Sequence, residues 1–414
     1  MSELAQLLFW LLVGTTVVQG LMVGRYFWAL WRWKSRGSGP RDTPKAVAIL
    51  CVRGNDPVLE ACLAALLNQD YPSYDVRVVV DSRTDPAWEV VQAAVARGGA
   101  AIRVQVEPLT RRRDTCSRKI AGVLQALAGL DKGYEVVAML DSDTIPHRSW
   151  LSELVAPLAD PRCGAASGNR WYMPARTSWA DLTRSVWNAA AVVQMYWYGI
   201  PWGGSTAFRA DLLRHTNLFE RLAGAFGEDS TLSRTIRRHG YRVAFVPSGM
   251  IVNRDTCRMG GLCRFLQRQL LTVRMHNPWW WAVVAHGLFT SLWLVAVLAV
   301  FVAALLTANR QAAGWSGASA VAYPLVSLLL LAPLEIAVRR IVAARGEPTR
   351  WLGAVGLLKL PLAIPITQVV YGAVLLVTMF TRTHRWRNVL YRFGRNPRVQ
   401  VLEDCPSQTT DALE

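Results

Sequence analysis

Short apolar runs alternate with helical patterns along residues 46–250. After the first run, Asn55-Asp56-Pro57 provides a cap with proline at the first helical position, which predicts a helix to about Leu67. Asp85-Pro86 repeats this device after the second run, and a further helix is predicted over 118–128. The predicted strands are Ala46–Val52, 76–80, 102–106 and 136–140. Repeated strand–helix units of this length predict an α/β domain with a mostly parallel sheet covered on both faces.

An uncharged stretch precedes this domain. Residues 4–24 are long enough to cross a hydrocarbon core of ~30 Å. Glu3 precedes the stretch and no small-residue cleavage site follows it, so a transmembrane helix is favoured over a signal peptide. The basic residues that follow are Arg32, Lys34, Arg36 and Arg41. The positive-inside rule therefore places the α/β domain in the cytosol.

Membrane segments are also predicted after the α/β domain. Residues 260–277 mix Arg and Gln with apolar side chains, which is typical of a helix at the membrane surface. Residues 279–308 are uncharged, and 319–338 carry a charge only at Glu335, so both are predicted to cross the membrane.

The last apolar stretch, residues 352–380, poses a problem of topology. Lys359, Pro361 and Pro365 interrupt it, and the arginine-rich tail that follows is expected in the cytosol. Two full crossings need ~40 residues, which this stretch does not have. A re-entrant or broken hairpin is therefore the preferred interpretation, and a single crossing with an exterior tail is the alternative.

Composition agrees with an integral membrane protein. Hydrophobic residues make up 52% of the chain, and the net charge of +17 gathers around residues 32–45, 339–350 and 382–398. Each basic cluster borders an apolar run, which favours membrane topology over nucleic-acid binding. The seven cysteines contain no C-x-x-C pair, which is typical of a reduced, cytosolic domain without disulfides or zinc. The heavy use of Arg and Ala favours a bacterial inner membrane, with the endoplasmic reticulum or Golgi as the eukaryotic alternative.

Asp141-Ser142-Asp143 follows the apolar run 136–140 directly. Two carboxylates at this spacing, just beyond a strand of a parallel sheet, are suited to a hard divalent cation such as Mg²⁺ or Mn²⁺. Diphosphate oxygens and water would complete its coordination, and the cation would neutralise a departing nucleoside diphosphate. The alternative is a polar turn after a strand.

Other polar residues stand at predicted strand or helix ends. Glu228 and Asp229 open a helical run to about His239, where acids also serve as a helix start; functionally, Asp229 is a candidate general base. Asp81 and Asp85 follow the strand 76–80 and are candidates for contacts with a base or ribose, although Asp85 before Pro86 also fits a helix cap. Lys119 lies at the start of the helix predicted over 118–128, where a lysine is expected either to bind phosphate or to face solvent.

Five short motifs resemble the ceramide glucosyltransferase-like branch of the family 2 glycosyltransferases. The resemblance extends from the first span to about Pro278, with weaker support in the tail from Trp386-Arg387 to Tyr391-Arg392. The motifs are Arg53-Gly54-Asn55-Asp56-Pro57, the run 70–76 (Asp-Tyr-Pro-Ser-Tyr-Asp-Val), Asp85-Pro86-Ala87, Asp141-Ser142 and Glu228-Asp229.

The resemblance implies a GT-A fold, a UDP-sugar donor (UDP-glucose first), a divalent metal and inversion at the anomeric carbon. By position, Asp85 and Asp141 would contact the nucleotide, Asp143 the metal, and Asp229 would be the base. Arg53, Asp81, Lys119, Glu228, Gln267 and Arg268 complete the candidate donor site.

The chain departs from this family in one motif. The family has Gln/Arg-x-x-Arg-Trp near the membrane; Gln267 matches, but Leu270 and Leu271 stand where Arg and Trp are expected. Arg268 or Arg274 are the candidates to supply the missing cation. The departure weakens the case for ceramide as acceptor and for a processive polysaccharide synthase.

The sequence thus predicts transfer of a hexose from a UDP-sugar to the hydroxyl of a ceramide- or diacylglycerol-like membrane lipid. The alternatives are a processive polysaccharide synthase and a non-catalytic binding protein on a degenerate domain. The predicted segments are an N-terminal span (1–31), a cytosolic GT-A domain (42–258), an interface helix (259–278), a C-terminal membrane region (279–380) and a basic cytosolic tail (381–414).

Overall fold

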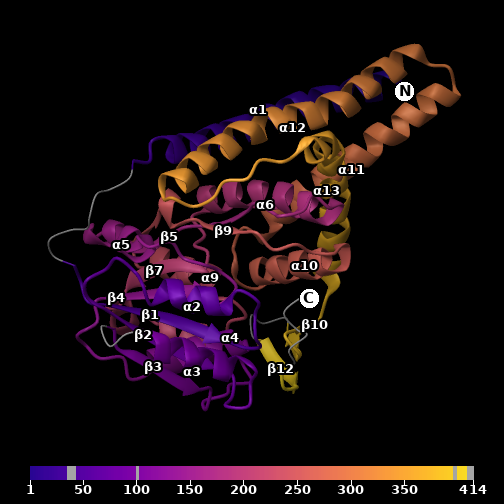
Figure 1. Cartoon of the computed structure of the whole chain (residues 1–414). Coiled ribbons are helices and arrows are strands. Elements are labelled where there is room, and N and C mark those ends of the chain that lie inside the picture. Colours follow the sequence, from indigo (N-terminus) through magenta and orange to yellow (C-terminus); the bar gives the residue numbers. More distant parts are fainter. Residues whose placement is uncertain (35–42, 99–101, 395–398, 408–414) are drawn as a thin grey trace.

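The computed structural model of the chain describes residues 1–34, 43–98, 102–394 and 399–407 (Figure 1). Parts of two of the three basic clusters, among them Arg36 and Arg41, lie outside the described residues, as do the end of the predicted tail and residue 42.

A seven-stranded sheet forms the centre of the α/β domain, in the order β3-β2-β1-β4-β7-β5-β8. Its strands are β1 (Ala46–Val52), β2 (Tyr74–Val80), β3 (Val104–Pro108), β4 (Val136–Asp141), β5 (Cys163–Ser167), β7 (Ser205–Arg209) and β8 (Arg242–Phe245). All pairings are parallel except those of β7, which runs antiparallel between β4 and β5. The predicted mostly parallel α/β sheet is confirmed, while β7 lay in a region where the sequence predicted no element.

Helices cover both faces of this sheet. Alternate side chains of β1 point to opposite faces: Ala48 and Leu50 belong to one apolar cluster and Val47 and Ile49 to the other. The first face carries α2 (Leu59–Leu66), α3 (Ala87–Arg97) and α5 (Trp150–Val155); the second carries α4 (Arg118–Leu127), α8 (Leu218–Leu222) and α9 (Glu228–Arg238). Burial on both faces explains why the strand reads as an uninterrupted apolar run.

Element boundaries differ from the prediction by a few residues. The strand predicted over 102–106 is observed as β3, over Val104–Pro108. Helix α2 begins two residues after Pro57, because Asp56 accepts the N–H of Val58 in a turn before the helix. The remaining short elements are η1 (Ala156–Ala159), β6 (Arg170–Tyr172), α7 (Leu212–His215), η2 (Pro247–Gly249) and β9 (Ile251–Asn253); β6 and β9 pair in parallel.

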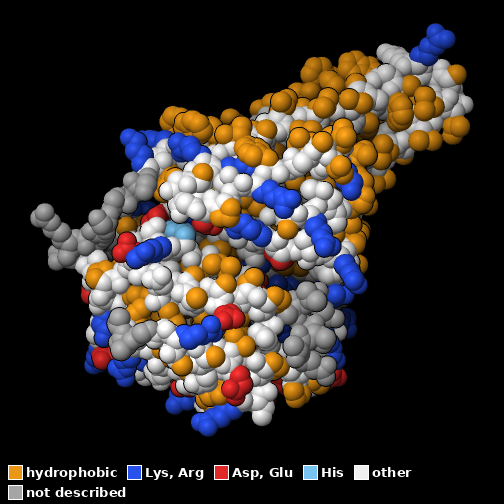
Figure 2. All heavy atoms as spheres, in the orientation of Figure 1, with side chains coloured by type: hydrophobic (Ala, Val, Ile, Leu, Met, Phe, Trp, Pro, Cys, Tyr) orange, Lys and Arg blue, Asp and Glu red, His pale blue; other side chains and the backbone are white. Residues whose placement is uncertain are grey.

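Four helices of the described chain are long and apolar enough to cross a membrane. They are α1 (Ser2–Trp31), α11 (Trp280–Leu306), α12 (Arg310–Ala344) and α13 (Ala354–Phe380), so α12 extends well beyond the predicted span 319–338. The helices α1, α11 and α12 form an arm that projects from the α/β domain (Figure 1). In Figure 2, hydrophobic side chains cover this arm, as expected of a lipid-facing surface.

Contacts at the two ends of this arm fix its direction. At the far end, the Ser2 hydroxyl donates to Asn309 Oδ1, which joins the start of α1 to the α11–α12 turn (Figure 1). At the near end, Arg340 donates to the carbonyl of Trp31, where α1 leads into the α/β domain. The N-terminus and the α11–α12 turn therefore lie at one end of the arm and the α/β domain at the other.

The preferred interpretation of residues 352–380 as a broken or re-entrant hairpin is wrong. α13 is one continuous helix of 27 residues that contains both Pro361 and Pro365. Neighbouring helices supply polar groups to this segment: Thr290 of α11 donates to the Gln368 side chain and Ser291 to the Gln368 carbonyl. Such partners allow prolines inside a helix at membrane depth.

Both ends of α13 contact the α/β side of the molecule. Near its start, Lys359 donates to the carbonyl of Thr177 in the α/β domain. At its end, Arg274 of α10 (Met259–His276) donates to the carbonyls of Met379 and Thr381. The helix packs along α6 (Trp179–Tyr198), itself part of the domain, and leads directly into the tail, which lies against the domain.

The tail forms a small antiparallel sheet, although no strand was predicted there from the sequence. Its strands are β10 (Thr383–Trp386), β11 (Val389–Phe393) and β12 (Val399–Asp404). Val389, Tyr391 and Phe393 are buried against Phe226 and Leu271, so the sheet is fixed to the α/β domain and to α10.

Candidate active site

A cavity of about 190 Å³ lies beyond the carboxyl ends of β1 and β4, where ligands bind in sheets of this kind. Its walls come from the ends of these strands, the start of α9, the loop 199–204, α6, α10 and the tail sheet. The structure brings Arg53, Asp81, Lys119, Asp141, Asp143, Glu228, Asp229 and Arg268 together around this cavity.

Asp141 and Asp143 are paired with cations. Nη2 of Arg170 lies 3.1 Å from Asp143 Oδ1 and 3.4 Å from Asp141 Oδ2. Lys119 Nζ lies 2.6 Å from Asp141 Oδ1 and also contacts Glu228. Although burial opposes ionisation, Lys119 and Arg170 hold the pKa of Asp141 below its ordinary value. Asp141 is therefore ionised and able to bind a cation.

The surroundings of these two aspartates are chemically suited to a divalent metal. Their carboxylates supply hard oxygen ligands, and nearby Asn253 donates to the Asp143 carbonyl while its own Oδ1 is buried without a partner. In the described part of the chain, no group of three or more His, Cys, Asp or Glu residues is arranged so that it could hold a metal ion. A metal here would therefore take most of its ligands from diphosphate and water, and it would compete with Arg170 for the same carboxylates.

Asp229 lies in the first turn of α9, beside Glu228. The backbone N–H of Gly203 donates to Asp229 Oδ1 at 2.6 Å. Burial, and then the charge of Glu228, raise the pKa of Asp229 to about 8, whereas Lys119 acts in the opposite direction. A carboxylate with a raised pKa is a stronger proton acceptor, and a pKa near the working pH is favourable for a general base.

Two glycines allow the backbone to approach these acids. A Cβ at residue 203 would lie 1.7 Å from Glu228 Oε1, and a Cβ at residue 204 would lie 2.5 Å from Asp141 Oδ2. No other residue type fits at either position without displacing an acid. No functional residue was predicted in this loop from the sequence, although an adjacent glycine pair is a signal of close backbone approach.

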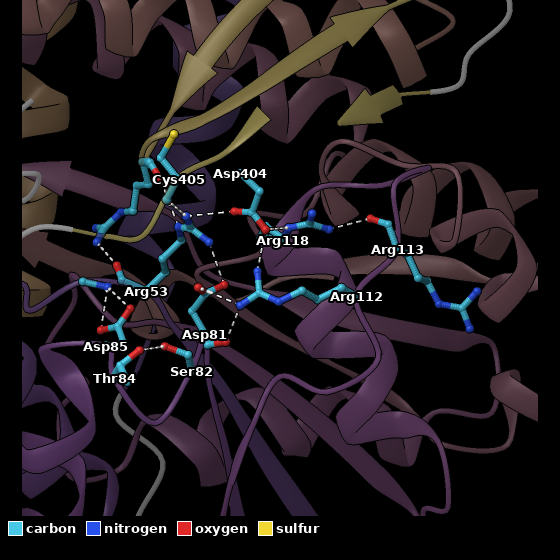
Figure 3. Close-up of polar contacts among 12 residues, drawn as sticks. Arg53, Asp81, Ser82, Thr84, Asp85, Arg112, Arg113, Arg118, Asp404 and Cys405 are labelled. Atoms are coloured by element: carbon cyan, nitrogen blue, oxygen red, sulfur yellow. Dashed lines mark hydrogen bonds and ion pairs between the residues drawn. The ribbon is translucent and has the colours of Figure 1, made fainter. Parts of the chain in front are cut away.

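A network of arginines and aspartates closes the β1–β2 edge of the cavity (Figure 3). Arg53 Nη1 lies 2.7 Å from Asp81 Oδ1, and Arg112 Nη2 lies 3.1 Å from Asp81 Oδ2. Asp404 of the tail pairs with Arg53 at 3.0 Å and with Arg118 at 2.9 Å. Asp81 thus lines the cavity, but arginines engage both its carboxylate oxygens.

Two predicted donor-site residues do not line the cavity. Asp85 accepts the N–H groups of Gly54 and Ala87 at 3.0 and 2.8 Å, so it caps α3 and fixes the loop after β1 (Figure 3). Gln267 instead donates to Thr381 Oγ1 at 2.9 Å and contacts the ring of His384.

Arg268, rather than Arg274, is the α10 cation at the cavity. Its guanidinium lies 4.9 Å from the Trp386 ring centroid and 5.7 Å from that of Phe265. Arg274 is occupied with carbonyl groups at the end of α13. The expected positions of Arg and Trp hold Leu270 and Leu271, both of which are buried.

Several cavity residues were not found from the sequence. They are Arg170, Trp202, Gly203, Gly204, Phe226, Trp386, Arg387 and Tyr391. Arg170 also lies over the ring of Trp202, at 4.8 Å from its centroid. Apart from the glycine pair and the tail motif that contains Trp386, Arg387 and Tyr391, no local pattern marks these residues, because they reach the cavity from segments whose position depends on tertiary packing.

Comparisons with known proteins were made for the whole chain. The family model described as Glycosyl transferase family 21 matches residues 13–399. An "N-acetylglucosaminyltransferase" of Rhizobium meliloti (strain 1021) is 26% identical over 228 residues, which are 51% of this chain. The chain spans about half the length of this curated relative (51%).

Among the solved structures that are similar to this chain are two glycosyltransferases. The mannosyltransferase PcManGT from Pyrobaculum calidifontis, in complex with GDP-Man and Mn²⁺, is 20% identical, with 91% of this chain and 97% of that chain covered and a TM-score of 0.48. The glucosyl-3-phosphoglycerate synthase of Mycobacterium tuberculosis, in complex with Mn²⁺ and UDP-glucose, is 19% identical, with 55% and 78% covered and a TM-score of 0.37.

Proposed function

The chain belongs to glycosyl transferase family 21, and from this premise we propose that it transfers a hexose from a UDP-sugar to the hydroxyl of a membrane lipid, with inversion at the anomeric carbon. Glucose is the first candidate sugar, and a ceramide- or diacylglycerol-like lipid is the proposed acceptor. A bacterial inner membrane with the α/β domain in the cytosol is the proposed location.

The proposal rests on one observation. A carboxylate with a raised pKa lines the same cavity as charged residues suited to a diphosphate. Asp229, with its raised pKa, faces the same cavity as Lys119, Asp141 and Arg268. A nucleotide-sugar transferase needs both parts: a base for the acceptor hydroxyl and positive charge for the leaving nucleotide. A protein that only binds the nucleotide has no need of the base, which favours catalysis over the non-catalytic alternative.

The membrane side of the cavity supports a lipid acceptor. Trp187, Val192 and Met195 of α6 and Phe265 of α10 form an apolar wall, and both helices pack against α13. A lipid hydroxyl can reach this wall from the bilayer while a soluble nucleotide enters from the opposite side.

The reaction is a single displacement. Asp229 accepts the proton of the lipid hydroxyl, whose oxygen forms the new bond to the anomeric carbon while the bond from that carbon to the UDP oxygen breaks. The departing UDP carries away the bonding pair, and Lys119 and Arg268 offset its charge. Asp141 and Asp143 are the residues that would hold Mg²⁺ or Mn²⁺, which when bound neutralises the same diphosphate.

The test is transfer of label from UDP-[¹⁴C]glucose to a total lipid extract by the full-length protein in nanodiscs, with Asp229→Asn as control. A discrete glycolipid that the variant does not form is the expected result. The donor panel also includes UDP-galactose and UDP-N-acetylglucosamine. A labelled polymer would favour the processive synthase, and no transfer from any donor would contradict the proposal.

A further inference from the structure

The tip of the β10–β11 hairpin has an unusual backbone conformation. β10 ends at Trp386 and β11 begins at Val389, so Arg387 and Asn388 form a two-residue turn with φ values of +46° and +60°. This left-handed region suits Asn or Gly, whereas an arginine is disfavoured there because of its Cβ. Such strain persists where a side chain has a function that the backbone must accommodate.

The Arg387 side chain points into the α/β domain. Its guanidinium donates to the carbonyl of Arg53 and lies 3.4 Å from Asp56 Oδ2, and it lines the cavity. Arg385, two residues earlier, pairs instead with Glu403 on the outer side of the tail sheet and is half exposed. The two arginines thus offer a matched pair, one at the cavity and one away from it.

Arg268 reaches the same cavity from α10 as a cation without an anionic partner. It stacks on Trp386, and no described carboxylate forms an ion pair with it. Burial lowers its pKa, and the nearby charge of Arg170 lowers it further, whereas Asp143 and Asp141 act in the opposite direction. Arg170 and Arg387 each pair with an aspartate, so Arg268 is the guanidinium of this group that an anionic ligand would neutralise.

The tail sheet is held in place by contacts at both ends. Leu271 is fully buried in the cluster that contains Phe226, Val389 and Tyr391. At the other end Asp404 pairs with Arg53 and Arg118 (Figure 3). Leu271 stands where a tryptophan is expected. It therefore belongs to the apolar cluster against which the hairpin with Trp386 and Arg387 packs.

We propose that the C-terminal sheet completes the donor site: Arg387 and Arg268 bind the diphosphate of the nucleotide donor, and Trp386 positions Arg268 by stacking. This inference rests on the proposed function. The hairpin tip delivers the cation and the aromatic ring that α10 lacks at Leu270 and Leu271. Guanidinium groups suit this task because they bind phosphate oxygens through paired N–H donors.

The test separates diphosphate binding from sugar transfer. Affinities for UDP and for uridine are measured by calorimetry on the full-length protein in nanodiscs, without acceptor. Arg387→Gly removes the guanidinium but keeps a residue that favours positive φ, so the hairpin is retained. UDP affinity is expected to fall about 10- to 100-fold while uridine affinity and the melting temperature do not fall. Arg385→Ala is the matched control and leaves UDP affinity unchanged.

A second variant tests the role of the sheet as a whole. Asp404→Ala removes the ion pairs to Arg53 and Arg118 and is expected to weaken UDP binding and to speed tryptic cleavage after Arg385 and Arg387. Arg387→Gly protein that binds UDP as tightly as the wild type would overturn the proposal. Wild-type protein that binds UDP but transfers no sugar would overturn the proposed function alone, leaving the assignment of Arg387 supported by its binding data.

Discussion

The backbone N–H of Gly203 donates to Oδ1 of Asp229 at 2.6 Å, and a Cβ on Gly203 would lie within 3 Å of the carboxylates of both Asp229 and Glu228. The acids at the start of α9 therefore hold their positions only because residue 203 has no side chain.

Gly203→Ala is expected to reduce sugar transfer by at least about 100-fold, the loss typical of a displaced general base. The added methyl group must push aside buried carboxylates rather than a flexible side-chain end. Initial rates with labelled UDP-glucose measure the effect. Gly314→Ala is the control, because no atom lies within 4 Å of a Cβ at this α12 position, and it leaves the rate unchanged. Wild-type rates for Gly203→Ala would contradict the proposed role of Asp229.

The pH dependence of transfer follows from the raised pKa of Asp229. A general base acts when deprotonated, so kcat/KM is expected to rise with pH and to level off above about 8. Asp229→Asn lowers the rate about 10²–10⁴-fold and abolishes this rise of kcat/KM with pH. Because Lys119 lowers the pKa of Asp229, Lys119→Met shifts the rise of kcat/KM to higher pH, whatever its effect on the maximal rate. If kcat/KM of Asp229→Asn still rises with pH in this way, the base is another residue.

Arg170 is expected to control metal binding. Its guanidinium pairs with both Asp141 and Asp143, so Arg170→Ala frees Asp143 and Oδ2 of Asp141 for a cation, while Lys119 still pairs with Oδ1 of Asp141. The affinity for Mn²⁺ without donor is expected to rise about 10-fold or more, as measured by the electron paramagnetic resonance signal of free Mn²⁺. Adding Asp143→Asn removes the gain, and Arg209→Ala, which breaks the pair with Asp211, has no effect. Unchanged Mn²⁺ affinity in Arg170→Ala would place the metal elsewhere.

The course of α13 predicts which residues share a side of the membrane. Cys405 in the tail is exposed, as are Glu220 in the α/β domain and Glu3 at the far end of the arm. A membrane-impermeant maleimide is expected to label Cys405 and Glu220→Cys from one side of sealed vesicles and Glu3→Cys from the other, as identified by peptide mass spectrometry. Labelling of Cys405 from the same side as Glu3→Cys would mean that α13 crosses the membrane.

Much of the architecture follows from local patterns. β1 is apolar throughout because helices cover both faces of its sheet, and this burial makes a parallel strand recognisable in the sequence. Asp141 and Asp143 were found for a related reason, since polar residues directly after such a strand lie at the edge where the sheet binds ligands. The long uncharged helices are likewise evident, because the thickness of a bilayer sets a minimum length.

Tertiary structure decided the rest of the site. Arg170 reaches Asp143 from another strand pair, Gly203 reaches Asp229 across the domain, and Arg387 reaches the Arg53 carbonyl from the far end of the chain. The sequence also favoured a break at Pro361 and Pro365, whereas α11 supports one continuous α13. A one-dimensional pattern records what each residue needs locally, namely burial, a cap or an apolar surrounding. Which distant side chain meets that need depends on how whole elements pack, and this is determined only in the folded chain.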